Sequence, residues 1–190
     1  MRAFVAVELD DPARAFVADE QRLVAKLLGS KSSSLRLVEP RQIHLTLVFL
    51  GNVAPALVEP LTAAMRQPIA GVAPFRLGIG GLGVFPLRGT PRVLWLGLSA
   101  GERQLNALHA AVAGRVAALG IPLEERGFRP HLTLARWRHA RPSDRPALDH
   151  VTTRAGGAMT VDRVTLFESR LSSEGASHVP LAQAPLSATS

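Results

Sequence analysis

The tetrapeptide HLTL occurs at His44–Leu47, within RQIHLTLVFLG, and again at His131–Leu134, within GFRPHLTLARW. The two copies lie nearly half the chain length apart. Each copy ends the same predicted succession of a short apolar strand, a helix and a second strand. The first strand and the helix of the two successions are predicted at 3–9 and 11–28, and at 93–98 and 102–119. A repeated architecture explains the second HLTL better than chance does.

The remaining segments fit around this repeat. Apolar runs predict strands at 73–81 and 161–167, and helices are predicted over 55–67 and, as a short polar helix, over 143–155. Asp11 is expected to cap the first helix, with Pro12 in its first turn. The glycine cluster GIGGLGVFP at 78–86 lacks the Lys-Ser/Thr of a phosphate loop, and a proline stands where a helix would have to begin. That cluster is therefore predicted to be a loop or a strand end.

Composition excludes several classes of protein. No apolar run approaches the roughly 18 residues that a transmembrane helix needs, and Glu8 and Asp10 interrupt any signal-peptide core. The chain has no cysteine, which rules out disulfides, thiolate metal sites and a cysteine nucleophile. A cytoplasmic location is expected. The net charge is +7 and 20 of the 22 basic residues are arginine, which suits an anionic partner, although an arginine-rich surface that only confers solubility would look the same.

The HxT pattern places two polar groups on one face of a strand. Side chains alternate along a strand, so His44 and Thr46 share one face while the leucines between and after them share the other. The same holds for His131 and Thr133. If a pseudo-twofold axis relates the two halves, the two His-Thr pairs face each other across a cleft.

Two facing imidazoles suit acid–base chemistry on a phosphodiester. An imidazole has an ordinary pKa near 6.5, so near neutrality one ring can accept a proton while the other donates one. The threonine hydroxyls can donate hydrogen bonds to the phosphoryl oxygens, and no metal is required. The other four histidines lack the HxT context and are expected to be surface or structural residues: His109, His139, His150 and His178.

A structural role, a metal site and a serine triad each account for the motif less well. A single histidine in an apolar strand is more often structural than functional, but the repeat with its threonine argues against a structural role here. A metal site is disfavoured because two histidines without a carboxylate pair form a poor ligand set. A serine triad is disfavoured because no GxSxG elbow exists.

The paired HxT motifs resemble those of the 2H phosphoesterases, and within them the RNA 2′,3′-cyclic phosphodiesterases, also called 2′-5′ RNA ligases. The resemblance extends to the flanking blocks RAFVAVEL, FPLRGTPRVLWLGL, FRPHLTLAR and VTLFESRLSSEG. It implies an α+β, bilobal, duplicated fold in which two antiparallel-sheet lobes with outer helices face each other across a central groove. Residues 1–190 would then form a single 2H phosphoesterase domain of two pseudo-symmetric lobes.

The resemblance also implies a reaction, the hydrolysis of a terminal 2′,3′-cyclic phosphate of RNA to a 2′-phosphate. His44 would protonate the departing 3′-oxygen and His131 would activate water. Thr46 and Thr133 would hold the phosphoryl oxygens. If a 5′-hydroxyl replaced the water, the same residues would form a 2′-5′ linkage without ATP.

Three further residues are marked by the resemblance. Arg136 matches the family's arginine after the second motif and would contact phosphate. Strict alternation, however, puts it on the leucine face, so its role requires a bulge or bend at Ala135. Phe4 is implied to line the base pocket. Relatives commonly place a tyrosine where this chain has His178.

The expected partners are RNA ends or nucleotides that carry a 2′,3′-cyclic phosphate. No cofactor, metal or membrane is expected, and we expect a monomer. Two alternatives stay open: a phosphodiesterase for small nucleotides such as ADP-ribose cyclic phosphate or 2′-5′ oligoadenylate, and a non-catalytic RNA-binding module. Both intact HxT motifs argue against a pure binder, which has no need of two titratable rings.

Overall fold

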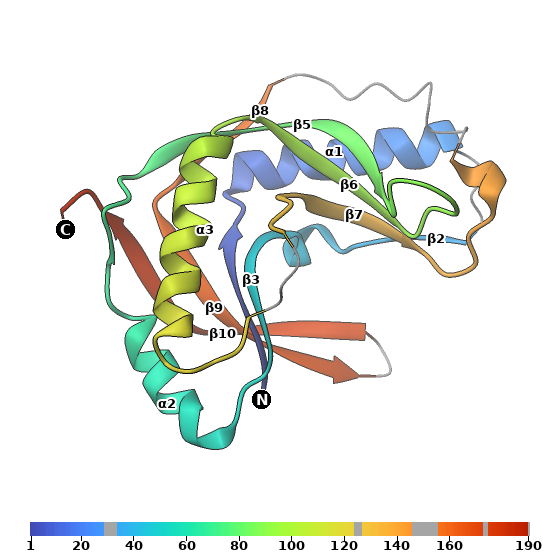
Figure 1. The fold of residues 1–190 in the computed structure, drawn as a ribbon. Coiled ribbons are helices and arrows are strands. Elements are labelled where there is room, and N and C mark those ends of the chain that lie inside the picture. Colours follow the sequence, from blue (N-terminus) through green and yellow to red (C-terminus); the bar gives the residue numbers. More distant parts are fainter. Residues whose placement is uncertain (29–33, 124–126, 146–155, 173–174, 190) are drawn as a thin grey trace.

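The strands form a broad sheet, antiparallel except for the parallel pair of β4 and β10, with helices packed against it, as a computed structural model shows (Figure 1). The structure describes residues 1–28, 34–123, 127–145, 156–172 and 175–189. The elements, with η for 3-10 helices, are β1 (Arg2–Glu8), α1 (Asp11–Leu28), β2 (Leu35–Leu37), η2 (Pro40–Gln42), β3 (His44–Asn52), α2 (Pro55–Ala64), β4 (Ile69–Ala70), β5 (Phe75–Phe85), β6 (Val93–Ala100), α3 (Glu102–Ala117), β7 (Leu132–Trp137), η3 (Pro142–Asp144), β8 (Gly157–Val161), β9 (Arg163–Ser172) and β10 (Gly175–Ser187).

The strand order divides the sheet into two lobes. Within the described residues the order is β4-β10-β9-β1-β3-β7-β6-β5-β8, with β2 paired to β7. In this order the strands up to β3 form the first lobe, and β7 with the strands beyond it forms the second. In the described part of the chain, β3 and β7 pair at a single position, Leu45 with Leu132. The predicted α+β, two-lobed class is confirmed, with the two lobe sheets joined at this pair.

Each of the two long helices packs mainly on the other lobe from the strand that precedes it. Helix α1 follows β1 but contacts β7 and β8, where a Cβ at Gly157 would collide with the ring of Phe16. Helix α3 follows β6 but contacts β3 and β4 of the first lobe more than it contacts β5 of its own lobe. The two connections therefore cross between the lobes and tie them together (Figure 1).

Most predicted helix bounds agree with the structure, and the differences are local. Asp10, not Asp11, caps α1, because its Oδ1 accepts from the Ala13 backbone N–H at 2.8 Å. The predicted helix over 143–155 is wrong where it can be judged, since η3 covers 142–144, and residues 146–155 lie outside the described part. The predicted strand at 161–167 is two strands, because β8 ends at Val161 and β9 begins at Arg163.

Of the two alternatives predicted for the glycine cluster at 78–86, the loop is wrong and the strand end is confirmed. Its residues up to Phe85 complete the long strand β5. The glycines are needed because the ring of Trp95, on β6, lies against β5: a Cβ at Gly83 would overlap that ring. A strand with a side chain at this position could not pair with β6 while Trp95 stayed in place.

The helices that the structure describes are not of the membrane-spanning kind. None of them combines the length and the apolarity that crossing a bilayer requires.

Candidate active site

The two HxT motifs meet at the junction of the lobes. Their leucines are buried, with Leu45 1% and Leu132 0% exposed. The histidines and threonines are half-buried on the opposite face, in agreement with the predicted alternation. All five predicted site residues line one groove of about 340 Å³, namely His44, Thr46, His131, Thr133 and Arg136.

The register explains why the two motifs face each other. Leu45 and Leu132 pair in antiparallel fashion, so a local twofold axis passes between them. Antiparallel pairing around this axis turns His44 toward the Thr133 end of β7 and Thr46 toward the His131 end. All four side chains line the same groove.

Both imidazoles are held in the same way by backbone carbonyl groups two residues earlier. His44 Nδ1 lies 2.7 Å from the Gln42 carbonyl oxygen, and His131 Nδ1 lies 2.7 Å from that of Arg129. A carbonyl can only accept, so Nδ1 carries the hydrogen in each ring. Nε2 is then the nitrogen left to exchange a proton with a substrate in the groove.

The surroundings lower the pKa of both rings. The pKa of His44 is lowered to about 4, chiefly by burial and in smaller part by the charges of His178 and His131, while the Gln42 carbonyl and Glu8 act in the opposite direction. Burial also lowers the pKa of His131, with Arg136 contributing. The ordinary value expected from the sequence therefore does not hold for either ring. Without a ligand both rings are largely neutral near pH 7, and a bound anion would favour their protonation.

A β-bulge follows each HxT motif. The register of β1 with β3 skips one residue at Leu47, and the register of β6 with β7 skips one at Leu134. Arg136 thereby returns to the groove face, so the bend that its predicted role required is present next to Ala135. Helix α1 fastens this bulge, because Gln21 Nε2 donates to the Leu134 carbonyl oxygen at 2.7 Å.

The first bulge brings Phe49 to the groove, at the position in β3 that corresponds to Arg136 in β7. The phenylalanine side chain is 50% exposed, and the sequence pattern does not single it out. Phe4 also lines the groove but is only 4% exposed. It stacks on His44 with ring centroids 4.7 Å apart, so it supports the imidazole and offers little open surface to a base.

His178, predicted to be a surface or structural residue, lies in the groove. Its ring meets that of His44 edge-on, with centroids 5.0 Å apart, and its Nδ1 is buried without a hydrogen-bond partner among the described residues. It lies on β10, far from both motifs in the sequence, and its own pKa is lowered by burial. His109 stacks on Phe128 at 4.2 Å and is structural as expected. His150 lies outside the described residues.

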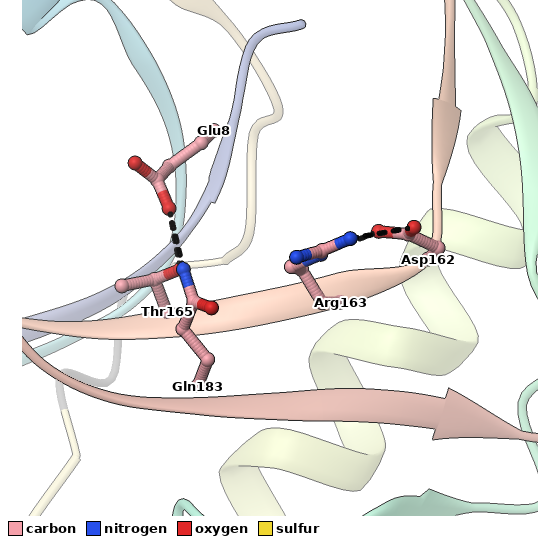
Figure 2. A network of polar contacts seen from close by, with 5 residues as sticks. All are labelled: Glu8, Asp162, Arg163, Thr165 and Gln183. Atoms are coloured by element: carbon pink, nitrogen blue, oxygen red, sulfur yellow. Dashed lines mark hydrogen bonds and ion pairs between the residues drawn. The ribbon is translucent and has the colours of Figure 1, made fainter.

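Glu8 lies opposite His44 in the pairing of β1 with β3. Figure 2 shows its carboxylate turned toward β9 and β10, where Oε2 accepts from Thr165 Oγ1 at 2.7 Å and from Gln183 Nε2 at 3.3 Å. Asp162 and Arg163 form a separate ion pair, with Arg163 Nε 2.9 Å from Asp162 Oδ1. Glu8 therefore acts on His44 through its charge, and the backbone orients the imidazole.

A metal centre has no ligand set in the part of the chain that the structure describes. This part contains no group of three or more histidine, aspartate or glutamate side chains placed to hold a metal ion.

Comparison with known proteins gives a consistent result. A family model described as the 2′-5′ RNA ligase superfamily matches residues 9–172. An Archaeoglobus fulgidus protein named RNA 2′,3′-cyclic phosphodiesterase is 32% identical, over 92% of this chain and 94% of its own. One of the same name from Geobacillus stearothermophilus is 34% identical over 88% of this chain, and the match spans 52% of that relative's length.

Solved structures agree with these matches. A Thermus thermophilus protein has a TM-score of 0.78 at 29% identity, with 97% of both chains covered. E. coli LigT in complex with 3′-AMP has a TM-score of 0.72 at 27% identity, covering 97% of this chain and 96% of that one.

Proposed function

The chain belongs to the 2′-5′ RNA ligase superfamily, and from this membership and the groove we propose that it hydrolyses the terminal 2′,3′-cyclic phosphate of RNA to a 2′-phosphate. The observation that carries the proposal is the matched anchoring of two imidazoles, each held through Nδ1 by a carbonyl and each lining the same groove. Relatives that match over most of their length are named for this activity. The groove, at about 340 Å³, has the size of a small-ligand site.

The proposed mechanism uses the two rings as acid and base. Nε2 of His131 takes a proton from water as its oxygen bonds to phosphorus, and Nε2–H of His44 protonates the departing 3′-oxygen. The P–O3′ bond breaks, which leaves a 2′-phosphate and a free 3′-hydroxyl. Charge grows on the non-bridging oxygens, where Thr46, Thr133 and the Arg136 guanidinium supply donors.

The lowered pKa values fit this mechanism only when substrate is bound. A cyclic phosphate carries one negative charge, which stabilises a protonated imidazole beside it and raises the pKa of His44 from its value of about 4. The substrate thus supplies the electrostatic condition under which His44 can act as an acid. Because both lobes contribute to the groove, we propose that residues 1–190 act as one unit.

We also propose that the same site forms and cleaves 2′-5′ linkages. A 5′-hydroxyl in place of water would attack the cyclic phosphate, and the reverse step would use the same two rings with their roles exchanged.

A phosphodiesterase for small nucleotides is the second candidate. It is favoured by the size of the groove and by the 3′-AMP complex of the structural relative E. coli LigT.

The direct test is to incubate the purified protein with an RNA that ends in a 2′,3′-cyclic phosphate and to map the product ends. We expect 2′-phosphate ends and the same rate with and without EDTA, because the catalytic groups are two imidazoles. A parallel reaction with a mononucleoside 2′,3′-cyclic phosphate separates the two candidate functions by their kcat/KM. Loss of activity in EDTA that a divalent ion restores would contradict the two-histidine mechanism.

Thr46→Ala and Thr133→Ala should each lower kcat/KM by about tenfold, since each removes one neutral hydrogen-bond donor. Thr46→Ser and Thr133→Ser should keep most of the activity because the hydroxyl is retained. The measurement is steady-state hydrolysis of a mononucleoside 2′,3′-cyclic phosphate. Serine variants as damaged as the alanine ones would instead indicate that the threonine methyl groups matter for packing.

A further inference from the structure

A second hollow lies beside the groove, on the second lobe. It has a volume of about 450 Å³. Its apolar wall consists of Phe85, Leu87, Trp95 and Phe128, and its charged residues are Arg129 and Glu102. We call it the β5–β6 hollow. Gly80 and Gly81, from the glycine cluster of the sequence, are among its lining residues.

The β5–β6 hollow is on the same face of the sheet as the groove. Trp95 pairs with Thr133 across β6 and β7, so both side chains project to one side. The ring of Phe85 meets that of His131 edge-on, with centroids 5.0 Å apart, and the ring of Trp95 lies at 6.3 Å from it. His131 thus forms the boundary between the groove and the hollow.

Glycines keep this hollow open. A Cβ at Gly83 would overlap the Trp95 ring, and one at Gly97 would lie 3.2 Å from it. Trp95 can therefore lie flat on the sheet and leave space above it. Leu87, in the connection from β5 to β6, is 60% exposed at the edge of this space, a large apolar side chain that the described residues do not cover.

The direction of the proposed displacement points to this hollow. In an in-line displacement at phosphorus the nucleophile enters opposite the leaving group. With the 3′-oxygen leaving beside His44, the nucleophile enters beside His131. A water molecule needs no further room, but a 5′-hydroxyl brings its own nucleoside, and that nucleoside must lie beyond His131.

We propose that the β5–β6 hollow binds the nucleoside whose 5′-hydroxyl attacks the cyclic phosphate, that is, the acceptor end of a second RNA strand. This inference rests on the proposed function. Aromatic and apolar side chains suit a nucleobase of any sequence, and the volume suits one nucleoside. The Arg129 guanidinium suits the next phosphate of the acceptor. The Glu102 carboxylate would repel that phosphate from its side of the hollow.

The step balances without any co-reactant. The bond from the 5′-oxygen to phosphorus forms and the P–O3′ bond breaks. The proton of the 5′-hydroxyl passes to His131, and the proton of His44 passes to the 3′-oxygen. The product is a 2′-5′ phosphodiester with a free 3′-hydroxyl, and the reverse reaction regenerates the cyclic phosphate and the 5′-hydroxyl.

The test compares two substrates that differ only in the acceptor nucleoside. A mononucleoside 2′,3′-cyclic phosphate needs only the groove, whereas cleavage of a 2′-5′ dinucleotide also needs the hollow. Leu87→Glu should lower kcat/KM for dinucleotide cleavage by about tenfold, the scale expected for losing one contact with a base, and leave hydrolysis of the cyclic phosphate within about twofold. Leu27→Glu, which changes a similarly exposed leucine on α1 (54%), should affect neither reaction.

Each other outcome would contradict either this inference or the proposed function. Equal loss of both reactions in Leu87→Glu, or no change in either, would overturn the inference. A wild-type protein that hydrolyses the cyclic phosphate but leaves the 2′-5′ bond intact would also overturn it, while the proposed function would stand. A wild-type protein that hydrolyses no cyclic phosphate would remove the proposed function itself.

Discussion

His44→Ala and His131→Ala should each lower kcat for hydrolysis of a 2′,3′-cyclic phosphate by about 10²–10⁴-fold, the range for losing a positioned acid or base. Each ring is oriented by a carbonyl 2.7 Å from Nδ1, which leaves its Nε2 as the proton-transfer atom that the substitution removes. The measurement is single-turnover hydrolysis of a mononucleoside 2′,3′-cyclic phosphate.

The double variant His44→Ala/His131→Ala distinguishes a shared step from two separate ones. Both rings act on one displacement, so the double variant should be little slower than the slower single variant. His139→Ala is the matched control, since that histidine is exposed and lies outside the groove lining. Near wild-type turnover in either single variant would show that the assigned role is wrong, and multiplicative losses would place the rings in different steps.

The pH profile of kcat/KM, which reflects the pKa values of the unliganded protein, should be shifted toward acid pH. The reaction needs one proton on the pair of rings: a second proton disables the base, and loss of the only proton disables the acid. Burial lowers the pKa of His44 to about 4 and lowers that of His131 below its ordinary value. The optimum of kcat/KM should therefore lie below about pH 6.5, the ordinary imidazole value, and kcat/KM should fall about tenfold per pH unit above its upper limb.

The profile of kcat should lie at higher pH, because the bound phosphate group raises both pKa values. NMR titration of the two imidazoles with and without inorganic phosphate measures the same shift directly. By linkage, phosphate should bind more tightly as the pH falls through the interval between the free and bound pKa values. A flat kcat/KM between about pH 5 and 8, or imidazole titrations that phosphate leaves unchanged, would contradict this account.

Local pattern was sufficient for much of the candidate site. Alternation along a strand predicts that the leucines of both HLTL copies are buried and that the histidines and threonines share the other face, and the structure agrees. The need for a bulge near Ala135 also follows from alternation, because no regular strand turns Thr133 and Arg136 to the same side. These inferences depend only on neighbouring residues of one strand.

Several features of the groove could not be reached in this way. His178 comes from β10 and meets His44 only because β10, β9, β1 and β3 are neighbours in the sheet. Phe49 reaches the groove because of the bulge at Leu47. The apolar residues around it in the sequence do not predict that bulge. The glycines of 78–86 resemble turn residues in the sequence, since the ring that requires them, Trp95, lies on another strand.

By itself the sequence determined the repeat, the strand and helix that precede each motif, and the chemical groups of the motifs, because backbone geometry sets the 2- and 3.6-residue periods locally. Only the tertiary structure decided that α1 covers the second lobe and α3 the first, that Leu45 pairs with Leu132, and that burial lowers the pKa of both rings. These depend on contacts between segments far apart in the chain. Packing and desolvation energies are summed over all neighbours in space, and no local pattern contains them.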